Sequence, residues 1–152
     1  MHRIRAYVDT SVFGGTQDDE FAEPSRRFFS RVHQGEFAVL LSTVTFRKLM
    51  KAPEAVRAVL RALPRSAVEE VRIDVEVKQL AREYIRAGAL TESSEADALH
   101  VAAATVAGAD LILSWNFRHI VNLKRILRYN SVNERGFGLS FDDDPEPIRG
   151  KL

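Results

Sequence analysis

The chain contains no cysteine among its 152 residues. Disulfide bonds, thiolate zinc sites and cysteine nucleophiles are therefore excluded, which suits a reducing cytoplasm. Any catalysis must use oxygen or nitrogen side chains or a bound ion. The length fits one domain that buries roughly two thirds of the surface of its unfolded chain, so no cross-link is needed for stability.

The chain also lacks a long apolar run and an excess of one charge. No stretch approaches the ~20 apolar residues of a membrane helix, and Met1-His2-Arg3 leads into a strand-like segment, not into the apolar core of a signal peptide. Twenty-two basic and 21 acidic side chains give a net charge of +1, so the molecule as a whole does not attract nucleic acid. We expect a soluble cytoplasmic protein without a membrane partner.

Short apolar runs alternate with segments of helical periodicity. Strands are predicted at residues 4–8, 37–41, 67–73, 111–113 and 137–141. Helices are predicted at residues 25–34, between Thr43 and Pro53, from Pro53 to Leu63, and at 74–88, 95–107 and 121–129. The alternation predicts a three-layer α/β/α domain over residues 1–141 with a mostly parallel sheet, followed by an acidic, mobile tail over residues 142–152.

Polar residues follow the predicted strands or begin a helix in three segments. These segments are Asp9-Thr10-Ser11, which we interpret as a turn loosened by Gly14-Gly15, then Glu95-Ala96-Asp97 and Ser114-Trp115-Asn116. Ligands of open parallel sheets bind at the carboxyl ends of the strands, near the point where strand order reverses. Each aspartate also has a purely structural interpretation, since Asp9 suits an Asx turn and Asp97 the first turn of a helix.

Two carboxylates at about 4 Å would repel by about 4 kcal/mol at an effective dielectric constant near 20. A shared proton, a basic residue or a divalent cation must then neutralise them. An all-oxygen site favours Mg²⁺ or Mn²⁺ over zinc, and such an ion would activate water toward a phosphodiester.

Three motifs carry a family resemblance. They read Tyr-Val-Asp-Thr-Ser-Val-Phe-Gly-Gly (Tyr7 to Gly15), Ser-Glu-Ala-Asp-Ala-Leu-His-Val-Ala (Ser94 to Ala102) and Ser-Trp-Asn-Phe-Arg-His-Ile-Val-Asn (Ser114 to Asn122). Over residues 3–133 the chain resembles a PIN-domain protein, close to the VapC-type toxins. The resemblance implies a ribonuclease dependent on Mg²⁺ or Mn²⁺, often paired with an antitoxin and often a homodimer.

By position in these motifs, Asp9 and Asp97 match the metal-binding aspartates of the family. Asn116 lies where many members have a further aspartate, and its amide would still orient a water molecule. Thr10 and Ser11 lie beside Asp9, where a phosphate or a metal-bound water would bind, although packing in an Asx turn also explains them. With Asn116, Ser114 would position water or metal, and Glu95 is a further nearby acid.

The sequence departs from the family pattern at Lys48. In Lys48-Leu49-Met50-Lys51-Ala52-Pro53, the resemblance predicts a glutamate at the first position. The expected set of acids carries a charge of −3, whereas two aspartates and a lysine carry a net charge of −1. Either Lys48 lies between the carboxylates as an internal counter-ion and weakens metal binding, or it points to solvent with Arg47 and Lys51 while Glu95 or Glu20 completes the site.

Other polar residues give weaker signals. His100 follows Asp97 by one helical turn, but this pair alone is a weak metal signature, and we interpret both His100 and His119 as packed, hydrogen-bonded residues. Arg118, Lys124 and Arg125 are candidates for RNA-backbone contacts. A solvated basic face explains them equally well.

The sequence thus predicts a metal-dependent ribonuclease of PIN type, the toxin of a type II toxin-antitoxin system. The alternative is a catalytically impaired PIN domain that binds RNA or an antitoxin, which Lys48 favours. A phosphoryl-transfer domain with Asp9 as nucleophile fits less well, because its pattern requires a second aspartate where the chain has Ser11.

Overall fold

A computed structural model of the chain describes residues 3–88 and 95–115. Its centre is a sheet of four strands in the order β3-β2-β1-β4, and all three neighbouring pairs are parallel. The strands are β1 (Ile4–Val8), β2 (Phe37–Ser42), β3 (Val68–Val71) and β4 (Leu111–Leu113). Because the strands are parallel, their carboxyl ends meet at one edge of the sheet.

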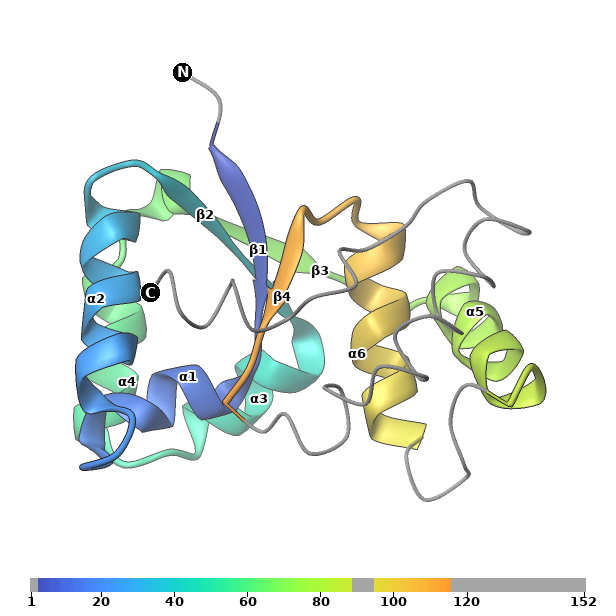
Figure 1. Cartoon of the computed structure of the whole chain (residues 1–152), viewed down its shortest axis with the longest axis horizontal. Helices are drawn as coiled ribbons and strands as arrows, with labels where there is room; N and C mark the ends of the chain where they lie inside the picture. The colour runs from blue at the N-terminus through green and yellow to red at the C-terminus, as the bar shows by residue number, and fades with distance from the viewer. Residues whose placement is uncertain (1–2, 89–94, 116–152) are drawn as a thin grey trace.

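Helices connect the strands and cover both faces of the sheet (Figure 1). They are α1 (Thr10–Gly14), α2 (Ala22–His33), α3 (Thr43–Met50), α4 (Glu54–Ala62), α5 (Val75–Arg86) and α6 (Glu95–Val106). Two 3-10 turns, η1 (Gly15–Gln17) and η2 (Arg65–Ala67), complete the described elements. Ser42 and Asp74 begin α3 and α5 by accepting backbone N–H bonds, as helix caps of these types do.

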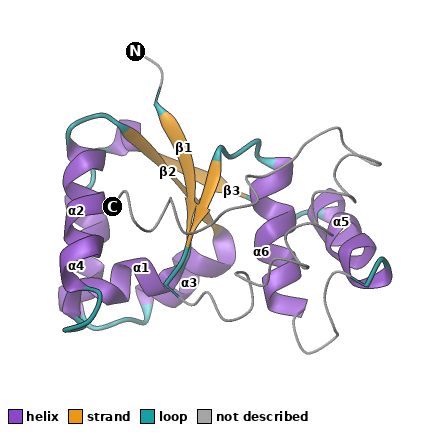
Figure 2. Ribbon diagram, in the orientation of Figure 1, coloured by secondary structure: helices purple, strands orange, loops and turns teal. Residues whose placement is uncertain are grey.

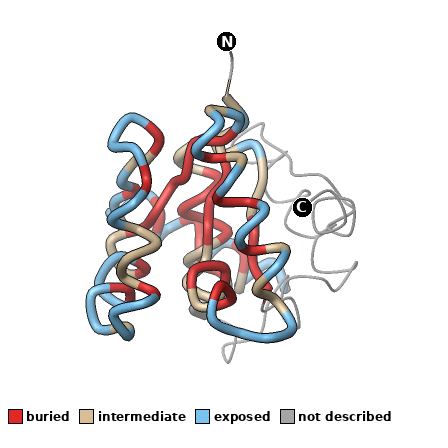
Figure 3. Tube along the Cα trace, turned by 90° about the vertical axis from the view of Figure 1, so that its left-hand side faces the viewer, coloured by how far each residue is buried: buried red, intermediate tan, exposed pale blue. Residues whose placement is uncertain are grey.

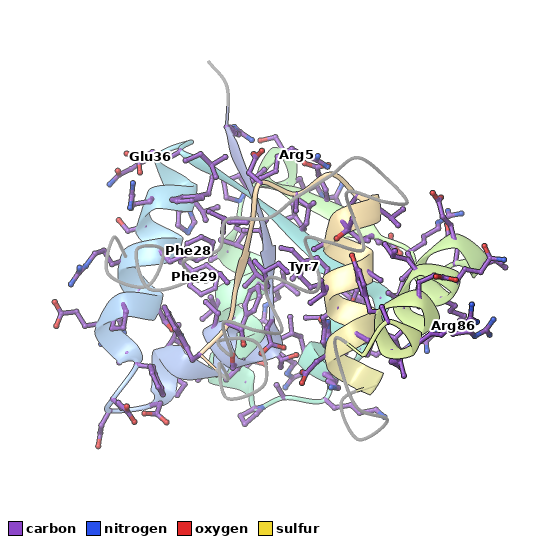
Figure 4. All side chains as sticks on the ribbon, turned by 45° about the vertical axis from the view of Figure 1, so that its right-hand side comes forward. Arg5, Tyr7, Phe28, Phe29, Glu36 and Arg86 are labelled. Carbon is purple, nitrogen blue, oxygen red and sulfur yellow. The ribbon has the colours of Figure 1, made fainter. Side chains whose placement is uncertain are left out.

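Alternation along the strands divides the core in two. In β1, Ala6 and Val8 pack with α2 and α4 on one side, whereas Tyr7 packs with α5 and α6 on the other. Figure 4 shows Tyr7 on the α6 side and Phe28 and Phe29 of α2 on the opposite side. The sheet therefore lies between two helical layers (Figure 2), as predicted.

The centre of the sheet is fully covered. All six residues of β2 are buried, and the buried segments of the chain converge on the strands (Figure 3). The alanine-rich helix α6 has consecutive buried residues from Val101 to Thr105, which confirms the prediction that it is enclosed. Its small side chains let it pack closely against α5 and the sheet.

Two local predictions were wrong. The chain after Asp9 is not a turn loosened by glycines, because Gly14 and Gly15 both have right-handed helical backbone and α1 continues directly into η1. Helix α2 begins at Ala22, three residues before the predicted start, since Pro24 lies in its first turn, where no backbone N–H is required.

Part of the sequence-based interpretation lies outside the described residues. This applies to the predicted helix at 121–129, the predicted strand at 137–141 and the tail at 142–152. Within the described residues, no helix has the length and apolar character needed to cross a membrane.

Candidate functional site

The candidate site lies at the carboxyl ends of β1 and β4. Successive strands β1, β2 and β3 run to one side of the sheet, whereas β4 lies on the other side of β1, so strand order reverses between β1 and β4. Val8 pairs with Leu113, and the Asp9 backbone N–H donates to the Leu113 carbonyl over 3.1 Å. Asp9 therefore lies at the reversal point, where parallel sheets place their ligands.

Asp9 caps helix α1 from an extended backbone conformation. Its Oδ2 accepts hydrogen bonds from Ser11 Oγ (2.8 Å), Ser11 N (3.4 Å) and Ser114 Oγ (3.0 Å). Among the described residues no donor contacts Oδ1. One carboxylate oxygen thus fixes the group, and the other is available to a ligand.

Ser11 and Ser114 brace this arrangement. Ser11 Oγ donates to Asp9 and also accepts from the Trp115 backbone N–H over 3.0 Å. It lies 3.4 Å from Ser114 Oγ, and the Ser114 residue is buried. The structure thus brings Asp9, Ser11 and Ser114 together, as the sequence predicted.

Thr10 adds an unsatisfied group beside Asp9. Its Oγ1 is buried and has no hydrogen-bond partner among residues 3–88 and 95–115. Buried hydroxyls almost always have a partner in a protein or a bound ligand. This hydroxyl could therefore form a hydrogen bond with a ligand or a ligand-bound water.

Helix α6 brings the second aspartate to the same neighbourhood. Asp97 is half-buried in its first turn, and His100 follows one turn later. Burial lowers the pKa of His100, while the charges of Asp9 and Asp97 act to raise it and that of Lys48 acts to lower it. The charges of both aspartates and of the lysine thus act on one imidazole.

His100 is a packed, hydrogen-bonded residue, as expected. Its Nδ1 lies 2.7 Å from the hydroxyl of Tyr7, and the two rings are 5.7 Å apart at a tilt of 60°. Sequence reasoning missed Tyr7 as a partner, because nothing in a buried strand indicates which side chain on a distant helix it contacts.

Lys48 projects from α3 as an exposed residue, together with Arg47 and Lys51. No ion pair joins Lys48 to a carboxylate of the described residues. The Lys48 residue is exposed to solvent, whereas its neighbour Leu49 is buried. Its charge nevertheless reaches the site through His100.

The remaining predicted residues lie on the surface or outside the described part of the chain. Glu20 is exposed, and Glu95 begins α6 with a side chain outside the described part of the structure. The same holds for Asn116, Arg118, His119, Lys124 and Arg125. Within the described part, no three His, Asp or Glu side chains form a group able to hold a metal ion.

Sequence reasoning also missed a brace behind the site. The Trp115 indole N–H donates to Ser25 Oγ over 2.7 Å, and Ser25 Oγ in turn donates to the Val12 carbonyl over 2.8 Å. Trp115 also stacks on Phe21 with ring centroids 5.6 Å apart. A signal existed in the sequence, because the only tryptophan follows Ser114 directly.

Comparisons with known proteins agree with this architecture. The family model of the PIN domain matches residues 6–120. No curated protein matches the chain.

Two solved structures are similar to the chain. One is VapC20 from Mycobacterium tuberculosis, a sarcin-ricin loop cleaving toxin, with a TM-score of 0.54, 15% identity and coverage of 75% of this chain and 92% of that chain. The other is VapBC2 from Rickettsia felis bound to a DNA fragment from their promoter, with a TM-score of 0.52, 13% identity and coverage of 76% and 92%. At these identities the similarity shows a common fold.

Proposed function

From the premise that the chain belongs to the PIN domain family, we propose that it is a divalent-metal-dependent ribonuclease and the toxin of a type II toxin-antitoxin system. The observation that carries this proposal is the Asp9 carboxylate, held on Oδ2 by three donors with Oδ1 available at the strand-order reversal. Similarity to VapC20, a toxin that cleaves the sarcin-ricin loop, supports RNA as the substrate class.

The donor set fits a magnesium or manganese ion. Asp9 and Asp97 would supply carboxylates, and Thr10 would supply a buried hydroxyl that has no partner within the described part of the chain. Hard divalent cations take oxygen ligands, and Mg²⁺ commonly binds through one or two carboxylates with water and phosphate completing its shell. Two carboxylates are therefore enough protein ligands for Mg²⁺. We propose that Asn116 and Glu95 supply further oxygen atoms to the site.

The bound ion would supply an activated water and would neutralise charge on the phosphodiester. Asp9 and Asp97 hold it. Ser11 and Ser114 keep the Asp9 carboxylate in one orientation, and Asn116 is proposed to orient the water. Arg118, Lys124 and Arg125 are proposed to hold the RNA backbone, a type of contact that fixes position and carries no sequence preference.

Cleavage assays test this proposal. Single-stranded RNA is incubated with Mn²⁺ and wild type, Asp9→Ala or Asp19→Asn, the last being an exposed aspartate between η1 and α2. We expect wild type and Asp19→Asn to cleave the RNA. In Asp9→Ala we expect the cleavage rate to fall at least 100-fold, because one of the ion's two charged ligands is lost. Equal cleavage by all three proteins would assign the activity to a contaminant and overturn the proposal.

A second candidate function is a catalytically impaired PIN domain that binds RNA or an antitoxin. Lys48 favours it, because its exposed positive charge stands where the resemblance predicts an acid and acts on the same imidazole as Asp9 and Asp97. Weakened affinity for Mg²⁺ or Mn²⁺ would follow. Retention of RNA in a gel-shift assay without cleavage in Mn²⁺ would support this alternative.

The partners follow from the same premise. We propose a cognate antitoxin, an RNA substrate met in the cytoplasm, and assembly as a homodimer. A gene for a small DNA-binding protein directly upstream, whose product co-purifies with this chain and suppresses cleavage, would support the antitoxin. Light scattering during gel filtration tests the homodimer.

A further inference from the structure

Tyr7 is a buried tyrosine directly beneath the candidate site. Its side chain has no exposed surface, and Figure 4 shows it between the sheet and α6. Its hydroxyl lies 2.7 Å from Nδ1 of His100. The hydroxyls of Ser42 and Thr45 lie beside the same phenol and stabilise its charged form.

The Tyr7–His100 contact joins the two elements that carry the aspartates. Tyr7 precedes Asp9 by two residues, so both belong to the same side of the pleated strand. His100 follows Asp97 by three residues, which places both on one side of α6. The hydrogen bond thus spans from β1 to α6 immediately behind the two carboxylates.

A phenol is uncharged at pH 7.5 and an imidazole is mostly so, because their ordinary pKa values are about 10 and about 6.5. A neutral imidazole has one donor and one acceptor nitrogen, and its hydrogen-bond partner decides which is which. With the phenol as donor, Nδ1 accepts and the proton of the ring stays on Nε2.

We propose that Tyr7 holds His100 as the Nε2–H tautomer, and that His100 is a positioning residue that presents this N–H to the acidic side of the site. The charged groups that act electrostatically on His100 are Asp9, Asp97 and Lys48. A neutral N–H donor among them fixes carboxylate orientation without adding a second positive charge beside Lys48. The role at the site depends on the proposed function, but the tautomer does not.

Nitrogen-15 NMR of the histidine side chains at pH 7.5 tests the tautomer in the wild-type protein. The His100 signals are identified by their absence from His100→Asn. We expect one nitrogen shift typical of an N–H at Nε2 and one typical of an acceptor at Nδ1. Tyr7→Phe should give a mixture of tautomers. A wild-type His100 protonated on Nδ1, or shifts unchanged in Tyr7→Phe, would overturn the proposal.

The matched control is Tyr84→Phe. Tyr84 is also fully buried, and its hydroxyl lies 3.1 Å from Thr105 Oγ1 on the same helix α6. Both substitutions remove one buried hydroxyl that contacts α6, so loss of packing alone predicts equal effects. The proposal requires that Tyr84→Phe leave the His100 tautomer unchanged.

Mn²⁺ binding by calorimetry tests the positioning role without any cleavage assay. An Asn side chain retains an acceptor near Nδ1, and a Gln side chain retains a donor near Nε2. We expect Mn²⁺ affinity to fall about 10–100-fold in His100→Asn, as for other residues that orient metal ligands, and to recover largely in His100→Gln. Equal losses in both, or the same loss in Tyr84→Phe, would reduce His100 to a packing role. Failure of wild type to bind Mn²⁺ would instead contradict the proposed function and leave the tautomer result intact.

Discussion

The Trp115 indole and Ser25 approach Gly15 so closely that this position has no room for a side chain. A Cβ built at Gly15 would lie 2.5 Å from Ser25 Oγ and 2.8 Å from the indole ring. Gly15 therefore lets Ser25 of α2 and Trp115, which follows Ser114 after β4, meet over the start of η1.

Gly15→Ala should destabilise the fold by about 1–3 kcal/mol, because overpacking forces neighbours out of place. The backbone of Gly15 is right-handed helical, so conformation is not the cause. Gly14→Ala is the matched control, since nothing lies within 4 Å of a Cβ there. Thermal unfolding should show a lower Tm for Gly15→Ala and an unchanged or higher one for Gly14→Ala. A Gly15→Ala protein as stable as wild type would contradict this account of the packing of Trp115 and Ser25 against Gly15.

Ser11→Ala should cost more stability than Ser114→Ala. Ser11 Oγ both donates to Asp9 and accepts the Trp115 N–H, so its loss affects two groups, whereas Ser114 Oγ donates to Asp9. Loss of the Ser11 acceptor for the Trp115 backbone N–H should lower the free energy of unfolding of Ser11→Ala by roughly a further 1–3 kcal/mol. Urea unfolding measures the difference, and Ser30→Ala on the exposed side of α2 should stay within about 0.5 kcal/mol of wild type. The reverse order of Ser11 and Ser114 would contradict the bracing geometry.

Stability should fall below about pH 6.5 because of His100. Burial, aided by Lys48, lowers the pKa of His100 below the ordinary 6.5, and Asp9 and Asp97 oppose this only in part. As the pH falls, the unfolded chain takes up a proton before the folded one does, so the stabilisation present above pH 6.5 is lost until the folded pKa is reached.

The loss amounts to about 1.4 kcal/mol for each pH unit between the two pKa values. Urea unfolding at pH 5.0 and 7.5 should show a smaller acid-dependent loss in His100→Asn than in wild type. His33→Gln, an exposed position on α2, serves as the control. An identical loss in wild type and His100→Asn would assign the acid dependence to other groups.

Lys48→Glu should increase Mn²⁺ affinity, on the order of tenfold or about 1.4 kcal/mol. The substitution removes a positive charge that acts on the site and adds the acid that the family resemblance predicts. Lys51→Glu makes the same charge change one helical turn away and is the control. Calorimetric titration that gives equal, tight binding by wild type and Lys48→Glu would remove the proposed effect of Lys48.

Sequence reasoning reached the fold and the location of Asp9 because both depend on local signals. Apolar runs ending in Asp9 and Ser114 predicted strand ends, and parallel order brings such ends to one edge. Helix start residues such as Asp74 were equally readable, because a cap acts on its own neighbours.

The errors and omissions came from contacts between distant segments. Gly14-Gly15 reads as a loose turn, yet Gly15 is required by Trp115, a neighbour only in the folded chain. Tyr7 reads as one more apolar strand residue, although its partner His100 lies 93 positions away. The direction of Lys48 depends on how α3 packs, which spacing along the chain does not determine.

The residues before Asp9, Ser42 and Ser114 pack on the side of the sheet that α2 and α4 cover. Because side chains alternate along a strand, Asp9, Ser42 and Ser114 all belong to the opposite side, which α6 covers. Because these three residues must stay on the same side of the sheet, the strands cannot freely gain or lose single residues during evolution. Inserting or deleting one residue within β1 would transfer Asp9 to the opposite layer, away from α6 and Asp97. Length variation among relatives that keep this site should therefore be confined to the connecting loops, or occur in pairs of residues within a strand.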